Sequence, residues 1–186
     1  MGKRGSGKTT LIKRKLIELD FKNKNVIIFD TLLEYGDLNN FSIVNNSISF
    51  KELVNNFISE KRKIKIIIQP LGEEGYLEEA FEKICYYVKI IGNVIFVIEE
   101  TDLYCSPYYI SENLRYIIEY GRHRNIGIIA SARRFTALSR YLTSQAHKII
   151  TFRQTEPRDL KLLSEFDFDP DIVSKLKDYE FIEKEI

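Results

Sequence analysis

The sequence of 186 residues has no tryptophan, two cysteines, two histidines and no apolar run of 18 or more residues. Without such a run we expect no membrane-spanning helix, and no charged-then-apolar leader with a small-residue cleavage site opens the chain. Cys85 and Cys105 form no Cys-x-x-Cys pair, and His123 and His147 lack ligand spacing. Free thiols in a reducing compartment are therefore expected rather than a disulfide or a metal site. These absences predict a cytoplasmic protein.

The chain also has no internal repeat, low-complexity tract or Pro/Gly-rich linker. With 44% hydrophobic residues it is long enough for a full-sized core, so residues 1–186 are predicted to form a single domain. The net charge of +1 hides an uneven distribution: residues 115–161 carry ten basic and three acidic side chains, whereas residues 162–186 carry three basic and eight acidic ones. We interpret the first block as a candidate polyanion surface and the residues from about 162 as an acidic tail.

Residues 2–9 read Gly-Lys-Arg-Gly-Ser-Gly-Lys-Thr, a complete G-x-x-x-x-G-K-[ST] phosphate-binding loop followed by a helix-like stretch. Glycines let the backbone N–H groups point inward, and the helix start adds its dipole to this anion site. Lys8 is expected to reach the β- and γ-phosphates, and Thr9 to bind Mg²⁺. The alternative is a glycine-rich surface turn. The predicted nucleotide-binding residues are Gly2, Lys3, Arg4, Gly5, Ser6, Gly7, Lys8, Thr9 and Thr10.

Apolar, β-rich runs alternate along the chain with segments of helical period. This alternation, with runs apolar on both faces, predicts an α/β fold: a three-layer sandwich with a mostly parallel sheet. Strands are expected at 26–29, 64–68, 94–98, 126–131 and 148–152, and helices at about 8–20, 50–60, 75–91 and 111–121.

The run Val94-Ile-Phe-Val-Ile is followed by two acids, Glu99 and Glu100. Ligands collect at the carboxyl ends of parallel strands, so both carboxylates are expected near the phosphates. Glu99 would help to hold Mg²⁺ through its water shell, and Glu100 would polarise the attacking water. By itself such a strand end could simply be solvated, but the phosphate-binding loop favours catalysis. The sequence thus predicts a Mg-dependent ATPase.

The order of these segments resembles the HerA/FtsK superfamily of DNA-translocating ATPases over nearly the whole chain. The resemblance rests on the phosphate-binding loop, on Asp30, Glu34 and Tyr35 after the next strand, on the acidic strand, and on the later segments 121–134 and 149–153. The compact size is similar to genome-packaging ATPases of archaeal and other double-jelly-roll viruses. At the position of the superfamily's polar γ-phosphate sensor, often Gln, this chain has Arg133, which could stabilise developing phosphate charge.

In ring ATPases, an arginine from the neighbouring subunit completes the site. Arg122 and Arg153 are the candidates here; for Arg153 the alternative is that it and Arg158 pair with Glu156 and Asp159 as surface ion pairs.

The resemblance implies a ring-forming homo-oligomer that couples ATP hydrolysis to movement of double-stranded DNA. Its location would be the host cytoplasm or the virion, with a viral capsid or membrane component as a further partner. The alternative is a toxin-like or assembly ATPase of filamentous viruses, or a small-molecule phosphate-loop kinase. Paired strand-end acids favour water over a small molecule as the phosphate acceptor.

The phosphate-binding loop normally follows a buried strand, yet only Met1 precedes it here. We expect that strand to lie centrally, with the strands at 94–98 and 126–131 on one side and the strand at 148–152 on the other. Its loss would leave buried backbone groups without partners, at about 1 to 3 kcal/mol each. This sequence therefore predicts that the strand is truncated and that Met1 is an internal methionine of a longer chain.

Overall fold

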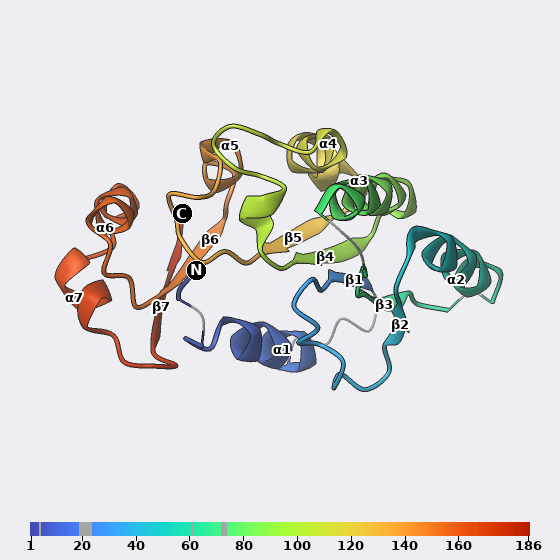
Figure 1. Ribbon diagram of the computed structural model, residues 1–186, viewed down its shortest axis with the longest axis horizontal. Helices are drawn as coiled ribbons and strands as arrows, with labels where there is room; N and C mark the ends of the chain where they lie inside the picture. The colour runs from blue at the N-terminus through green and yellow to red at the C-terminus, as the bar shows by residue number, and fades with distance from the viewer. Residues whose placement is uncertain (4, 19–23, 61, 72–73) are drawn as a thin grey trace. The chain divides into compact units, whose positions relative to one another are not determined.

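The computed structural model describes residues 1–3, 5–18, 24–60, 62–71 and 74–186 (Figure 1). Arg4, predicted to bind nucleotide, lies outside the described residues. The chain divides into two compact units. Unit 1 comprises Met1–Ile12, Glu100–Ile110 and Ser131–Ile186, and unit 2 comprises Lys13–Glu99 and Ser111–Ala130.

Unit 2 is built on a five-stranded sheet in the order β2-β3-β1-β4-β5, with every neighbouring pair parallel. The strands are β1 (Asn25–Phe29), β2 (Ser42–Val44), β3 (Lys65–Ile68), β4 (Val94–Ile98) and β5 (Gly127–Ala130). All five residues of β4 are buried, as a strand covered on both faces requires. The predicted α/β class with a mostly parallel sheet is confirmed.

Unit 2 contains the helices α2 (Ser47–Ser59), α3 (Glu74–Ile91) and α4 (Glu112–Tyr120), the last leading into the short η3 (Gly121–Arg124). Asn46 and Ser111 cap α2 and α4 by accepting hydrogen bonds from backbone N–H groups. Figure 1 shows α3 and α4 side by side over one face of the sheet. The Phe81 ring of α3 packs 5.1 Å from the Phe29 ring, which fastens this layer to β1.

Helix α1 (Lys8–Glu18) begins at the phosphate-binding loop, as predicted. Its first residues, through Ile12, belong to unit 1, and the rest belongs to unit 2.

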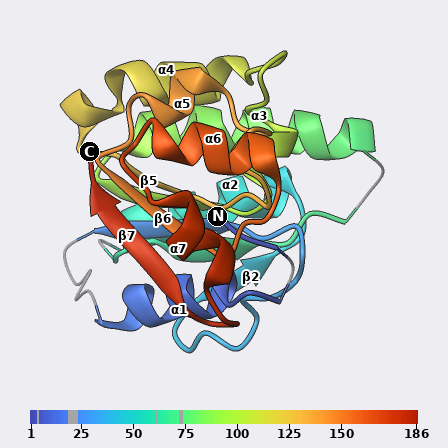
Figure 2. The same cartoon turned by 90° about the vertical axis from the view of Figure 1, so that its left-hand side faces the viewer.

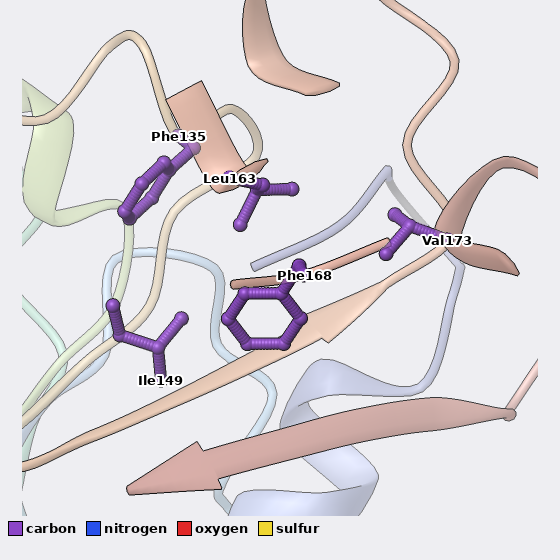
Figure 3. Packing of buried hydrophobic residues seen from close by; sticks show 5 residues of the cluster. All are labelled: Phe135, Ile149, Leu163, Phe168 and Val173. Atoms are coloured by element: carbon purple, nitrogen blue, oxygen red, sulfur yellow. The ribbon is translucent and has the colours of Figure 1, made fainter. Parts of the chain in front are cut away.

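Unit 1 contains two antiparallel strands, β6 (Lys148–Phe152) and β7 (Phe181–Glu185), which run side by side in Figure 2. Its helices are η2 (Thr101–Leu103), α5 (Arg140–Thr143), α6 (Pro157–Ser164) and α7 (Pro170–Lys175). A separate apolar cluster packs α6 and α7 against β6 (Figure 3); its buried members are Phe135, Ile149, Leu163, Phe168 and Val173.

The prediction for residues 148–152 was right about the strand and wrong about its partners. β6 pairs antiparallel with β7 rather than joining the parallel sheet. This partner lies within the segment interpreted as an acidic tail. β7 begins with Phe181 and Ile182 and ends in Glu-Lys-Glu, and Ile182 packs against the cluster of Figure 3. A high acidic content therefore concealed a strand.

Residues 1 and 2 also make strand-like hydrogen bonds. The Met1 amine donates to the Ile150 carbonyl at 2.6 Å, Phe152 N–H donates to the Met1 carbonyl at 2.8 Å, and Gly2 N–H donates to the Ala132 carbonyl at 3.3 Å. The loop thus starts between Ala132 and β6, the place expected for the strand before it. A longer preceding strand stays a prediction.

Candidate functional site

The phosphate-binding loop of unit 1 has the backbone that its glycines allow. Gly5 and Gly7 have φ angles of 79° and 100°, a region that other residues rarely adopt. Ser6 N–H donates to the Lys3 carbonyl at 3.2 Å, and Leu11 N–H donates to the Gly7 carbonyl at 2.9 Å, which starts α1. The N–H groups of the first helical turn, including Thr9 and Thr10, have no carbonyl four residues back within the helix. Backbone N–H groups at a helix N-terminus are suited to bind an anion.

Lys8 folds back over this loop. Its Nζ donates to the carbonyls of Gly2 at 2.7 Å and Lys3 at 3.1 Å, so the ammonium group lies at the rim of the backbone turn. The Lys3 side chain instead donates to Thr155 Oγ1 at 2.9 Å. Of the two described lysines in the loop, Lys8 is therefore the one whose ammonium group lies against the backbone turn.

Tight packing holds the loop from one side. A Cβ on Gly2 would lie 2.7 Å from Phe152 Cβ, and one on Gly7 would lie 2.7 Å from the Tyr179 ring, whereas a Cβ on Gly5 would meet open space. Tyr179 N–H also donates to the Ser6 carbonyl at 3.2 Å. The segment before β7 therefore supports the loop, a contact that nothing in the sequence indicated.

The buried hydroxyl of Ser6 has no hydrogen-bond partner among the described residues. A bound phosphate oxygen would supply an acceptor, so the loop fits a nucleotide phosphate chain.

Glu100 also lies in unit 1, and its carboxylate forms an ion pair with the Arg133 guanidinium. Glu100 itself has φ 47° and ψ 48°, a left-handed conformation that is strained for a residue with a side chain. Gln154, buried at the end of β6, donates from Nε2 to the Arg133 carbonyl at 3.1 Å. The structure thus brings together the predicted base and the predicted sensor arginine.

Asp102, which was not among the residues predicted from the sequence, joins this group. Burial raises the pKa of Asp102, and the negative charge of Glu100 acts in the same direction, while the cations Arg133 and Lys8 act against it. One buried carboxylate oxygen, Oδ1, has no hydrogen-bond partner among the described residues. The position of this acid just after the Glu99-Glu100 pair was the available signal. Lys8, Glu100, Asp102 and Arg133 therefore form one charged cluster within unit 1.

Glu99 belongs to unit 2 and has different surroundings. It is 1% exposed, and its Oε1 accepts a hydrogen bond from the fully buried hydroxyl of Tyr35. Asp30, which follows β1, accepts from the N–H groups of Glu34 and Tyr35, both at 3.0 Å, and from Gln69 Nε2 at 2.9 Å. Burial and then the charge of Glu99 raise the pKa of Tyr35 far above its ordinary value, so this phenol keeps its proton and donates.

The remaining arginines divide into engaged and exposed ones. Arg134 contacts the buried Asp159 at 3.0 Å and Glu156 at 3.6 Å, so the alternative that pairs these acids with Arg153 and Arg158 is wrong. Arg122 and Arg153 are exposed, and the described part of the chain gives neither an ion pair.

Most basic side chains in residues 115–161, the candidate polyanion surface, already have a partner within the protein. Besides Arg133 and Arg134, four basic side chains in residues 115–161 have a partner: Arg115 with Glu119, Arg124 with the Ile90 carbonyl, Arg140 with Glu165 and Lys148 with Glu183.

No family model and no curated protein matches this chain. Solved structures do match. The chain is similar to the genome-packaging NTPase B204 of Sulfolobus turreted icosahedral virus 2, solved with sulfate and with ATP-γS: the TM-score is 0.75 at 22% identity, over 99% of this chain and 88% of that one. It is also similar to B204, the DNA-packaging ATPase of Sulfolobus turreted icosahedral virus, with TM-score 0.73 at 24% identity over 99% and 89% of the two chains.

A more distant likeness is to the N-terminal domain of zonular occludens toxin from Neisseria meningitidis. The TM-score is 0.53 at 12% identity, over 83% of this chain and 75% of that chain. At these identities the likenesses establish the fold, and the predicted phosphate-loop NTPase architecture is confirmed. Among the helices that the structure describes, none is long and apolar enough to cross a membrane.

Proposed function

We propose that this protein hydrolyses ATP and uses the energy to move double-stranded DNA, as a viral genome-packaging ATPase. The observation that carries the proposal is the loop of unit 1, with two left-handed glycines, a helix start and Lys8 curled over the turn. It is supported by the fold likeness to packaging NTPases that were crystallised with ATP analogues.

Each residue has a role in this proposal. Backbone N–H groups of Gly5 and of Gly7 to Thr10 bind the phosphate oxygens, and Lys8 neutralises charge on the β- and γ-phosphates. Bound Mg²⁺ would supply further neutralisation, with Thr9 as a ligand and Glu99 acting through water. Glu100 takes a proton from the attacking water, and Arg133 stabilises charge that develops on the transferred phosphoryl group.

The resting ion pair gives this scheme an order of events. While Arg133 holds Glu100, that carboxylate is engaged by a cation and is not available to a water molecule. A γ-phosphate near Arg133 would compete for the guanidinium and release the carboxylate. Glu100 would then become available as the catalytic base only when nucleotide is bound.

We further propose that the working form is a homo-oligomeric ring, located in the host cytoplasm or the virion with a capsid or membrane component as partner. The exposed Arg122 and Arg153 are the candidates to complete a neighbouring site. Specific activity should then rise with protein concentration, and Arg122→Ala or Arg153→Ala should lose hydrolysis while retaining nucleotide binding. Activity that is independent of concentration, in a species that sediments as a monomer, would contradict this part.

The decisive experiment is an ATPase assay on the assembled protein with and without long duplex DNA. Stimulation by DNA that falls steeply with salt is expected, because backbone binding releases counterions. Equal rates with and without DNA would favour the second candidate, a toxin-like or assembly ATPase, which the likeness to the zonular occludens toxin domain keeps open. No hydrolysis at all, with wild-type ATP binding, would contradict both.

A further inference from the structure

A chain of hydrogen bonds in unit 2 has no role in the scheme above. Gln69, after β3, donates to the Asp30 carboxylate, which also accepts from the backbone of the following turn. That turn carries Tyr35, whose hydroxyl donates to Glu99 Oε1. These hydrogen bonds thus connect the ends of β3 and β1 to Glu99, the acid at the end of β4.

We propose that Tyr35 is a positioning residue that holds the Glu99 carboxylate in one orientation before nucleotide arrives, and that Asp30 fixes the turn from which Tyr35 reaches it. The inference rests on the proposed ATP hydrolysis, because the orientation of Glu99 matters only if this acid serves the metal-bound nucleotide. It gives a physical role to the pattern of Asp30, Glu34 and Tyr35, which the sequence alone offered only as a likeness to the HerA/FtsK superfamily.

Packing alone does not require this hydroxyl. A phenylalanine ring would fill the same buried space, whereas a hydroxyl at 0% exposure must find an acceptor. The acceptor is a carboxylate that is itself 1% exposed and that in turn needs a donor. Each group therefore supplies the other with a partner, and the bond restricts the rotation of the Glu99 side chain.

The chemical type of the donor is also informative. An arginine or lysine in the place of Tyr35 would hold Glu99 but would cancel its negative charge. A protonated phenol holds the carboxylate and leaves the charge available to a cation. Carboxylates that serve metals are commonly held by such outer hydrogen bonds, and loss of the partner typically costs about 10- to 100-fold in metal affinity or activity.

Asp30 gives the turn its rigidity. Its two carboxylate oxygens accept three hydrogen bonds, two of them from backbone N–H groups of Glu34 and Tyr35. Leu33, inside the turn, has φ 56°, so the backbone there is held in a left-handed conformation. The position of the Tyr35 hydroxyl is therefore set by the backbone as well as by ring packing.

The test compares Tyr35→Phe with Tyr87→Phe, a matched loss of one phenol hydroxyl in the same unit. The Tyr87 ring is half-buried on α3, with its centroid 5.6 Å from that of Phe50, so removing its hydroxyl leaves the ring packing intact. In Tyr35→Phe we expect kcat to fall about 10- to 100-fold and the Mg²⁺ concentration for half-maximal rate to rise, with nucleotide Kd changed less than about twofold. Tyr87→Phe should match the wild type in all three.

A second readout does not depend on turnover. With tyrosines labelled by ¹³C at Cζ, the Tyr35 signal is identified among the 11 tyrosines by its absence in Tyr35→Phe. In Glu99→Gln a neutral acceptor replaces the carboxylate, so this signal should shift while the Tyr87 signal stays in place.

The outcomes separate the two proposals. Wild-type kcat and Mg²⁺ dependence in Tyr35→Phe, or an unmoved Tyr35 signal in Glu99→Gln, overturns the positioning role and leaves the proposed ATPase standing. A wild-type protein that hydrolyses no ATP although the Tyr35 signal shifts overturns the proposed function, and the positioning role with it, while the hydrogen bond itself stands.

Discussion

Glu99 and Glu100 are consecutive in the chain, yet they have opposite surroundings. Glu99 is buried at the end of the parallel sheet of unit 2 and accepts from a neutral phenol. Glu100 starts the next part of unit 1, has a side chain that is 16% exposed, and pairs with a cation, Arg133, whose side chain is 55% exposed. The difference teaches which acid can change partners: an exposed ion pair is weak and exchangeable, whereas a buried hydrogen bond is not.

The same contrast recurs one residue apart in the arginines. Arg133 pairs with the strained Glu100, while Arg134 pairs with Asp159, a fully buried acid that also accepts from the N–H and hydroxyl of Thr136. Asp159 is satisfied by fixed partners, as expected of a structural acid. We therefore expect the Glu100 and Arg133 pair to govern turnover and the Arg134 and Asp159 pair to govern stability.

The largest effect is expected at Glu100. Glu100→Gln should retain nucleotide binding and lower the hydrolysis rate by about 10²- to 10⁴-fold, because the amide cannot accept the proton of the attacking water. Lys8→Ala should instead lose ATP binding, since the cation at the rim of the loop is gone. Fluorescent-nucleotide titration and single-turnover hydrolysis distinguish the two.

Glu78→Gln is the matched control, because Glu78 is an exposed acid on α3. It should behave as the wild type in both measurements. Undiminished hydrolysis by Glu100→Gln would show that the base has been assigned wrongly.

The second prediction sets Arg133→Ala against Arg134→Ala. Arg133→Ala should slow hydrolysis about tenfold or more with little change in the free energy of unfolding, because an exposed ion pair contributes only about 0 to 1 kcal/mol. Arg134→Ala should lower that free energy by about 1 to 3 kcal/mol, because the buried Asp159 loses a charged donor, while kcat stays near wild type. Urea denaturation and steady-state kinetics measure the two effects. If both variants changed the same quantity, the division between the neighbouring arginines would be refuted.

Sequence patterns located the loop, the strand-end acids and the sheet of unit 2 because each has a local signature. Glycine spacing specifies the loop, and the apolar run from Val94 to Ile98 specifies a strand buried on both faces. Unit 1 was harder to predict, since β7 has only two large apolar residues, side by side at its start, and depends on β6 as its partner. The edge strand β2, three residues long, gave no periodic signal.

Contacts between distant parts of the sequence were not predictable from local pattern. The ion pair of Glu100 with Arg133 joins residues 33 positions apart, and the bond of Tyr35 to Glu99 spans 64. The sequence indicated that these residues were candidates for chemistry, but only the fold determines which ones pair.

The smallest effect is expected at Asp102, which belongs to the same charged cluster as Glu100 and Arg133. Its substitution measures how much the charge of Asp102 lowers the free energy of unfolding. Burial raises the pKa of Asp102 above its ordinary value, so the native state binds a proton more readily than the unfolded chain. By linkage, the charged carboxylate lowers the free energy of unfolding progressively as the pH rises through the range in which Asp102 loses its proton. The penalty vanishes at low pH, where Asp102 is protonated in both the native and the unfolded state. Asp102→Asn, which carries no charge at any pH, should therefore slightly raise the free energy of unfolding at pH 7.5 and lose this advantage near pH 4. Urea titrations of both proteins at the two pH values measure the difference. A variant that is less stable than the wild type at pH 7.5 would mean that the negative charge of Asp102 is stabilised by Lys8 and Arg133 more than burial penalises it.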